Sequence, residues 1–162
     1  MTSQPPDGEL YDIQIIGIPL GIHRQAREHQ DALQREFALI ASHADSSPDI
    51  VPSRLLDLVR KLNTRFQSLT TEQEAKLQNA LESGADSVDL HYRLPAETSA
   101  ACVELTGLLR EADEYCDAGD ELLTLAAPPV VVAYREWLLN EFVRQIAGED
   151  PLPWEDANRP EA

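Results

Sequence analysis

The sequence is poor in basic residues. Lys and Arg number 13 against 29 Asp and Glu, so the formal net charge at pH 7 is −16. Nucleic acids and anionic membranes are bound largely through Lys and Arg, and we therefore expect no nucleic acid and no membrane among the partners. A basic protein surface would match this charge, but a general acidity of the source organism's proteins explains it equally well.

Cysteine and long apolar runs are also scarce. Cys102 and Cys116 are the two cysteines, and they lie on one expected helix, too far apart to bond to each other. No run approaches the roughly 18 apolar residues of a membrane span. The segment "MTSQPPDGEL" has neither the basic start nor the apolar core of a secretory signal. These features predict a cytoplasmic protein with reduced thiols.

No motif in the sequence identifies a reaction or a cofactor. Neither GxxxxGK[ST] nor GxGxxG occurs, so a phosphate-binding loop of those kinds is absent. The histidines form no HExxH or Cys/His cluster, and the acidic run "EADEYCDAGDE" breaks the alternating ligand pattern of a calcium loop. We therefore expect no metal and no cofactor, and the absences favour a protein that is not an enzyme.

What the chain does have is a globular composition, with 43% hydrophobic residues in 162. This corresponds to one domain of ordinary size with enough apolar surface for a core. Residues 1–9 are polar and Pro-rich and are expected to be disordered. Residues 10–148 are expected to form the globular domain, and residues 149–162 a Pro-rich acidic tail without regular structure.

Apolar periodicity predicts strands at 10–19, 87–95 and 121–129, and helices at about 20–44, 53–69, 70–84, 96–116 and 130–146. Thr71 and Glu74 have the spacing of a capping box, which predicts a helix start there. The fold class is therefore α+β, or small α/β. Three short strands would form a small sheet covered by about five helices, in the order β-ααα-β-α-β-α. The second and third strands would suit a right-handed parallel crossover.

Polar residues interrupt the apolar faces of two of these helices. His29 lies on the apolar face of the helix at 20–44, Glu36 lies at the edge of that face, and Arg135 lies within the apolar arc of the last helix. A buried Arg needs a carboxylate, and Glu36 is a natural partner. The favoured interpretation is a buried polar network of His29, Glu36 and Arg135 that fixes helix packing. The alternative is a ligand or catalytic site at the same residues.

The helix that begins near residue 53 carries the clearest surface feature. Arg54, Lys61 and Arg65 share a stripe, with Arg60 nearby, in a chain that is otherwise acidic. This stripe is either a docking face for an acidic or phosphorylated partner or a helix side that pairs with the protein's own carboxylates, such as Asp57.

Two aromatic residues on the last helix are further candidates for partner binding. Tyr134 and Trp137 lie on a side of that helix away from its apolar centre. Such residues are either additional core or the anchors of an interface, where Trp and Tyr are enriched. An interface between two copies of the chain through this helix is therefore also considered.

The order of several segments resembles a known family. The segments are "GIPLGIHRQAREHQDALQREFALI", "LHYRLP", "LLREADEYCDAGDELLTLAAPP" and "YREWLLNEFVRQI". Over residues 10–148 they resemble an uncharacterised actinobacterial family, often encoded beside anti-sigma-type ATPases, anti-sigma antagonists and serine phosphatases. The resemblance implies a role in stress signalling through sigma-factor control. The chain lacks the Asn-bearing helix and DxGxG-type loop of such ATPases and the paired metal-binding aspartates of the phosphatases, so it is expected to be neither.

These observations together predict a non-enzymatic protein-interaction or regulatory module with a protein partner. Two alternatives stay open. One is a small enzyme or ligand-binding domain with a polar site at His29, Glu36 and Arg135. The other is a homodimeric structural protein.

Overall fold

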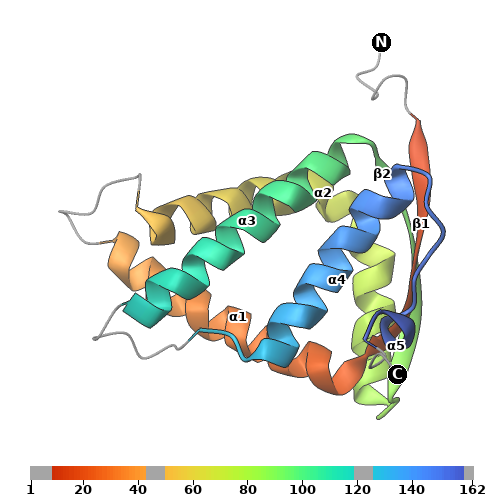
Figure 1. The fold of residues 1–162 in the computed structure, drawn as a ribbon, viewed down its shortest axis with the longest axis horizontal. Coiled ribbons are helices and arrows are strands. Elements are labelled where there is room, and N and C mark those ends of the chain that lie inside the picture. The colour runs from red at the N-terminus through yellow and green to blue at the C-terminus, as the bar shows by residue number, and fades with distance from the viewer. Residues whose placement is uncertain (1–8, 43–49, 119–125, 159–162) are drawn as a thin grey trace.

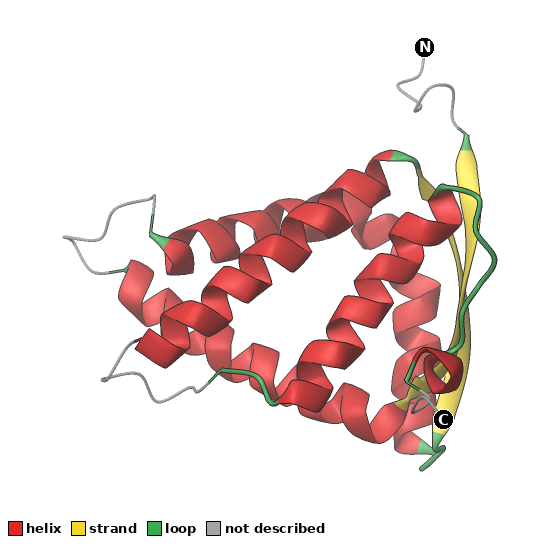
Figure 2. Cartoon of the chain, viewed as in Figure 1, coloured by secondary structure: helices red, strands yellow, loops and turns green. Residues whose placement is uncertain are grey.

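The computed structural model describes residues 9–42, 50–118 and 126–158. The elements in chain order are β1 (Leu10–Pro19), α1 (Leu20–Ala41), α2 (Val51–Glu82), β2 (Ser87–Pro95), α3 (Glu97–Ala118), α4 (Pro129–Ile146) and the one-turn α5 (Trp154–Ala157). The two strands form a ribbon along one side of the molecule, and the long helices lie on the other side of it (Figure 1). Helix dominates (Figure 2), and the α+β class is confirmed.

The described residues form a sheet of two strands, whereas the sequence predicted three. β1 and β2 pair antiparallel. Residues 121–125 of the expected third strand lie outside the described residues, and 126–128 form a loop. The prolines at 128 and 129 supply no N–H, and the Ala127 N–H donates to Asp113 Oδ1 at 3.1 Å. The described residues therefore show neither the predicted third strand nor its parallel crossover, and the rest of that strand lies outside them.

β1 buries one face against the helices, and a bulge changes which residues reach it. Ile13 and Ile15 alternate onto the buried face. The bulge between Ile15 and Ile18 inserts one residue, and Gly17 there adopts a φ of +74°, a value that favours glycine. Strict alternation from Ile13 and Ile15 would place Ile18 on the opposite face, but the inserted residue returns it to the core.

α2 is a single helix of 32 residues, whereas the sequence predicted two helices divided near Thr71. The Thr71 hydroxyl donates to the Gln67 carbonyl at 2.9 Å, one turn back along the helix, so it does not cap a new start. No glycine or proline interrupts the chain at this point. The second half of α2 consequently continues alongside β2 (Figure 1).

Glutamine side chains cover the middle of the ribbon on both edges. Gln14 of β1 and His91 of β2 are partners in the antiparallel register. The Gln14 N–H donates to Gln145 Oε1 and the Gln14 carbonyl accepts from Gln145 Nε2, both at 2.8 Å. On the other edge, the His91 carbonyl accepts from Gln73 Nε2 at 2.7 Å. Amides from α4 and α2 thus satisfy backbone groups that a neighbouring strand would otherwise bind.

Two apolar clusters form the core. One packs the inner face of the ribbon against α4 and includes Ile13, Leu90 and Phe142. The other joins α1, α2 and α3 and includes Phe37 and Leu55. Removal of these side chains from water is the main stabilising contribution, and it places α2 and α3 side by side.

The described part of the expected tail packs on the domain. The Trp154 ring lies 5.5 Å from the Trp137 ring and 5.9 Å from the Tyr134 ring, measured between centroids. Trp137 Nε1–H donates to the Leu152 carbonyl at 2.8 Å. Residues 149–158 therefore fold back onto α4, and α5 is a short regular element within a segment that was expected to have none.

Candidate functional site

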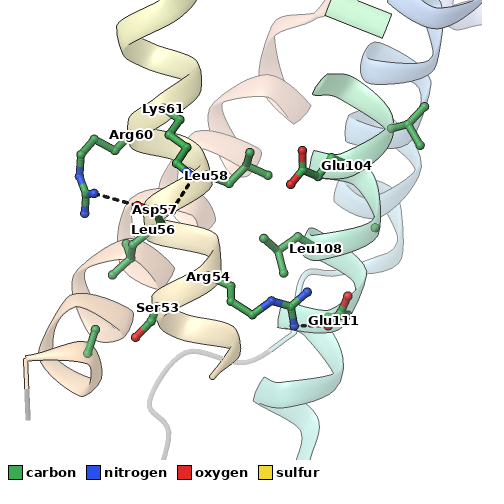
Figure 3. Close-up of a pocket in the computed structure, with 13 residues that line it drawn as sticks. Ser53, Arg54, Leu56, Asp57, Leu58, Arg60, Lys61, Glu104, Leu108 and Glu111 are labelled. Atoms are coloured by element: carbon green, nitrogen blue, oxygen red, sulfur yellow. Dashed lines mark hydrogen bonds and ion pairs between the residues drawn. The ribbon is translucent and has the colours of Figure 1, made fainter. Parts of the chain in front are cut away.

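A groove of about 830 Å³ runs between the first half of α2 and the middle of α3. Figure 3 shows Arg54 and Glu111 meeting across the space between the two helices and Glu104 pointing into it, whereas Arg60 extends from α2 away from α3. α2 contributes mainly basic and apolar residues to its walls, and α3 contributes apolar and acidic ones. Those used below are Arg54, Asp57, Leu58, Arg60, Lys61, Val103, Glu104, Gly107, Leu108 and Glu111.

The base of the groove is apolar. Leu58 and Leu108 are buried there, while Val103 on α3 is 59% exposed. Gly107 lies one helical turn beyond Val103, and a Cβ at this position would meet nothing within 4 Å. The missing side chain widens the groove on the α3 side. An apolar base with a charged rim is the usual composition of a protein-binding surface.

The rim on α2 has two cations that share one carboxylate. Asp57 accepts from Arg60 Nη1 at 3.0 Å and pairs with Lys61 Nζ at 3.1 Å. The hydrogen bond from Lys61 is the main reason why the pKa of Asp57 is lowered, and the Lys61 charge adds to it. Since one carboxylate balances one cation, this cluster has one positive charge in excess. Both basic side chains are strongly exposed, so they can exchange Asp57 for a partner's carboxylate at little cost.

The other two residues of the predicted basic stripe are paired with α3. Arg54 Nη1 lies 2.9 Å from Glu111 Oε1 across the groove. Arg65 is paired with Glu97 and does not line the groove. All four basic residues therefore pair with the protein's own carboxylates, as the interpretation of internal pairing requires. Arg54 and Arg65 bridge α2 to α3, while Arg60 and Lys61 bind Asp57 on their own helix and stay strongly exposed.

Glu104 on α3 is the rim's acidic counterpart to Arg60 and Lys61. It is exposed and forms no ion pair with another residue of the described ranges. The groove thus has excess positive charge on α2, an exposed valine on α3, and a carboxylate next to that valine. Charge of both signs across an apolar base can recognise a segment with the opposite arrangement of charges.

The structure does not support Tyr134 and Trp137 as surface anchors. Tyr134 is 2% exposed and Trp137 is 7% exposed, and both belong to the core cluster beneath the ribbon. The returning segment at 149–158 covers the side of α4 that the sequence left without a neighbour, and Trp154 packs on both rings. Their assignment as partner-binding residues is therefore corrected to a structural one.

Arg135 belongs to the predicted buried polar network, but its ion-pair partner is not the expected Glu36. Its guanidinium pairs with Asp113 of α3 and also donates to the Leu109 carbonyl at 3.4 Å. α4 packs on α3 at this level, which brings Asp113 to Arg135. His29 and Glu36 are half-buried. The charge of Glu36 contributes, after burial and Asp113, to the raised pKa of Cys116, which places Glu36 near the end of α3.

The buried histidine of α1 is His23 rather than His29. Its Nδ1 lies 2.8 Å from the Tyr134 hydroxyl, and the two rings meet edge to face with centroids 5.9 Å apart. Burial, followed by the charge of Arg27, lowers the pKa of His23 to about 4. His23 could have been identified from its position, because it lies one turn before Ala26 on the inward side of the helix.

Glu141 is a second buried polar residue without a clear sequence signal. It is 1% exposed on α4. Its Oε1 accepts from Gln145 Nε2 at 3.0 Å and from the Leu152 N–H at 2.9 Å, and its Oε2 pairs with Arg144. Every one of these contacts holds the returning segment or the ribbon in place, so Glu141 is a structural residue.

No group of three or more His, Cys, Asp or Glu in the described ranges is placed to hold a metal ion. No helix there is both long and apolar enough to cross a membrane. No protein-family model matches the chain. No curated protein and no solved structure matches it either. The chemistry of the α2–α3 groove is therefore the basis on which a function can be proposed.

Proposed function

We propose that the protein is a non-enzymatic interaction module that docks a helical segment of another protein in the α2–α3 groove. The observation that carries this proposal is the exposed Val103 beside buried leucines, between an excess positive charge on α2 and Glu104 on α3. Amphipathic helices bind other proteins by inserting apolar anchors into grooves of this composition.

The charges of the rim indicate what the segment carries. An acidic residue would face Arg60 and Lys61, an apolar residue would contact Val103 and Leu108, and a basic residue would face Glu104. Displacement of Asp57 by the partner's carboxylate would leave the cluster's charge balanced. Such pairs contribute mainly specificity and association rate, while burial of the apolar anchor contributes affinity.

A different protein fits the groove better than a second copy of this chain. Each copy has a formal net charge of −16, and repulsion between two such chains opposes their association. The partner that the sequence resemblance suggests is a regulator of sigma-factor activity, and we include this identity in the proposal. It would make the protein a regulatory component of a stress-signalling system.

Site-specific photo-crosslinking in the source cells tests the proposal. A photoreactive amino acid at Val103 should form a crosslink to one defined partner, because that side chain lies at the groove. The same group at Val130, which is also an exposed valine but lies at the start of α4, should not. The partner would be identified by mass spectrometry, and its crosslinked peptide should have the charges described above.

Charge reversal provides the second arm. The double variant Arg60→Glu, Lys61→Glu should abolish the Val103 crosslink, since it replaces the excess positive charge with a negative one. Arg24→Glu, which reverses an exposed charge on α1 outside the groove, is the matched control and should leave the crosslink intact. Equal crosslinking from Val103 and Val130, or survival of the Val103 crosslink in the double variant, would contradict docking in this groove. A crosslink between two copies would favour the homodimer instead.

A further inference from the structure

A second, smaller pocket lies where α2, β2, α3 and α4 meet. Its volume is about 200 Å³, and it is separate from the docking groove. Three aromatic rings, a threonine, an alanine and a cysteine are among the residues that line it: Phe66, Tyr92, Phe142, Thr98, Ala101 and Cys102. Tyr92 and Phe142 meet edge to face with centroids 5.1 Å apart.

The Thr98 hydroxyl is the second notable feature of this pocket. Thr98 is 5% exposed, and its Oγ1 has no hydrogen-bond partner in the described part of the chain. A buried hydroxyl without a partner is unfavourable, and native proteins rarely leave one unless a ligand or water completes the site. A ligand that supplies a donor or acceptor here would remove this penalty.

The charges around the pocket restrict the ligand further. Burial raises the pKa of the Cys102 thiol to about 12, so the inner wall is uncharged at neutral pH. Glu74 also lines the pocket and is exposed, and its negative charge contributes, after burial, to the raised pKa of Tyr92. Glu74 has Arg27 as its ion-pair partner at 3.8 Å, and no cation is among the residues that line the pocket. A carboxylate ligand would therefore lose its hydration without gaining a counter-charge, whereas a neutral ligand would not.

We propose that this pocket binds a small neutral aromatic molecule with a single hydroxyl, whose ring contacts Phe66, Tyr92 and Phe142 and whose hydroxyl pairs with Thr98. The volume suits one ring, since a cavity of about 150 Å³ binds benzene. Aromatic walls favour an aromatic ligand through edge-to-face contacts. This site is independent of the proposed docking function.

Titration of the full chain with phenol, toluene and benzoate, followed by amide NMR shifts, tests the assignment. Phenol should bind saturably at one site, with the largest shifts around Thr98 and Cys102, and benzoate should bind at least about tenfold more weakly. Thr98→Val keeps the shape and removes the hydroxyl, so it should weaken phenol about fivefold and leave toluene unchanged.

Two further variants locate the site. Ala101→Phe places a ring in the pocket and should abolish binding of both phenol and toluene. Gly107→Leu fills the docking groove and should leave both affinities unchanged. Absence of saturable phenol binding, benzoate binding equal to that of phenol, or equal loss of phenol and toluene in Thr98→Val would each overturn the proposal. If Ala101→Phe fails to fold, the Thr98→Val comparison and the positions of the shifted amides in the wild type still decide it.

Discussion

The buried His23 makes the fold sensitive to acid over a defined range of pH. In the folded protein its pKa is about 4, against an ordinary value of 6.5, because the side chain is buried and Arg27 lies nearby. The folded state therefore binds fewer protons at this residue than the unfolded chain does. Stability from this source is fully present above pH 6.5 and is lost as pH falls toward 4.

The size of the effect follows from the two pKa values. At pH 5 the unfolded chain has His23 almost fully protonated, whereas the folded protein has it protonated only about a tenth of the time. That difference corresponds to about 2 kcal/mol of unfolding free energy lost between pH 7.5 and pH 5. It is a large fraction of the stability of a domain of this size.

Chemical denaturation of the wild type and of His23→Gln at pH 7.5, 6 and 5 measures this contribution. Glutamine does not titrate, yet its amide can still bond the Tyr134 hydroxyl. The wild type should lose about 2 kcal/mol more than the variant between pH 7.5 and 5, since all other titrating groups are common to both. Trp137 and Trp154, which lie beside Tyr134, provide the fluorescence signal. Parallel pH profiles for the two proteins would refute the assignment of a depressed pKa to His23.

Three further changes test the packing. Arg135→Ala should destabilise the protein by about 3 kcal/mol in urea denaturation, because it leaves Asp113 largely buried and unpaired. The double variant Arg135→Leu, Asp113→Leu should recover most of this loss. Trp154→Ala should lower the unfolding free energy by about 2 kcal/mol if the half-buried ring anchors the returning segment, and an unchanged value would contradict that role. Gly107→Ala should raise the free energy of unfolding by about 0.5 to 1 kcal/mol, since alanine favours helix and its Cβ has open space; a lower melting temperature would show hidden crowding in the groove.

Local sequence patterns predicted where most helices and strands begin and end. They failed at positions where tertiary contacts determine the backbone conformation. The prolines before α1 and α4 mark helix starts that the sequence shows directly. Thr71 has the spacing of a cap, but a threonine hydroxyl can equally bond one turn back within a continuous helix, and spacing alone cannot distinguish the two. The bulge before Ile18 likewise shifts the strand's alternation in a way that no two-residue period reveals.

For the candidate site, the basic stripe was the most useful prediction. Arg54, Arg60 and Lys61 line the groove. The pairing of Arg60 and Lys61 with Asp57 follows from their spacing on one helix, whereas the pairing of Arg54 with Glu111 depends on how α2 packs on α3. His29 was expected on the apolar face of α1, whereas the buried side chains of this helix are those of Leu20, His23, Leu33 and Phe37.

Arg135 was expected within the apolar arc of α4 with Glu36 as its partner; its side chain is largely buried there, and its partner is Asp113. Asp113 belongs to an acidic run that suggests a solvated helix end, yet its side chain is largely buried against Arg135. A carboxylate within a charged run shows no sign of burial until the neighbouring helix is placed. The same holds for Tyr134 and Trp137, which look available only while residues 149–158 are left out.

The glutamine amides on either side of the ribbon occupy backbone groups at its centre. Sheets recruit foreign chains, and seed fibrils, through vacant backbone donors and acceptors along their margins. Here Gln145 and Gln73 already fill that role at the level of Gln14 and His91. Loss of either amide would leave backbone groups at the centre of the ribbon without these partners, at the point where another strand could pair with them.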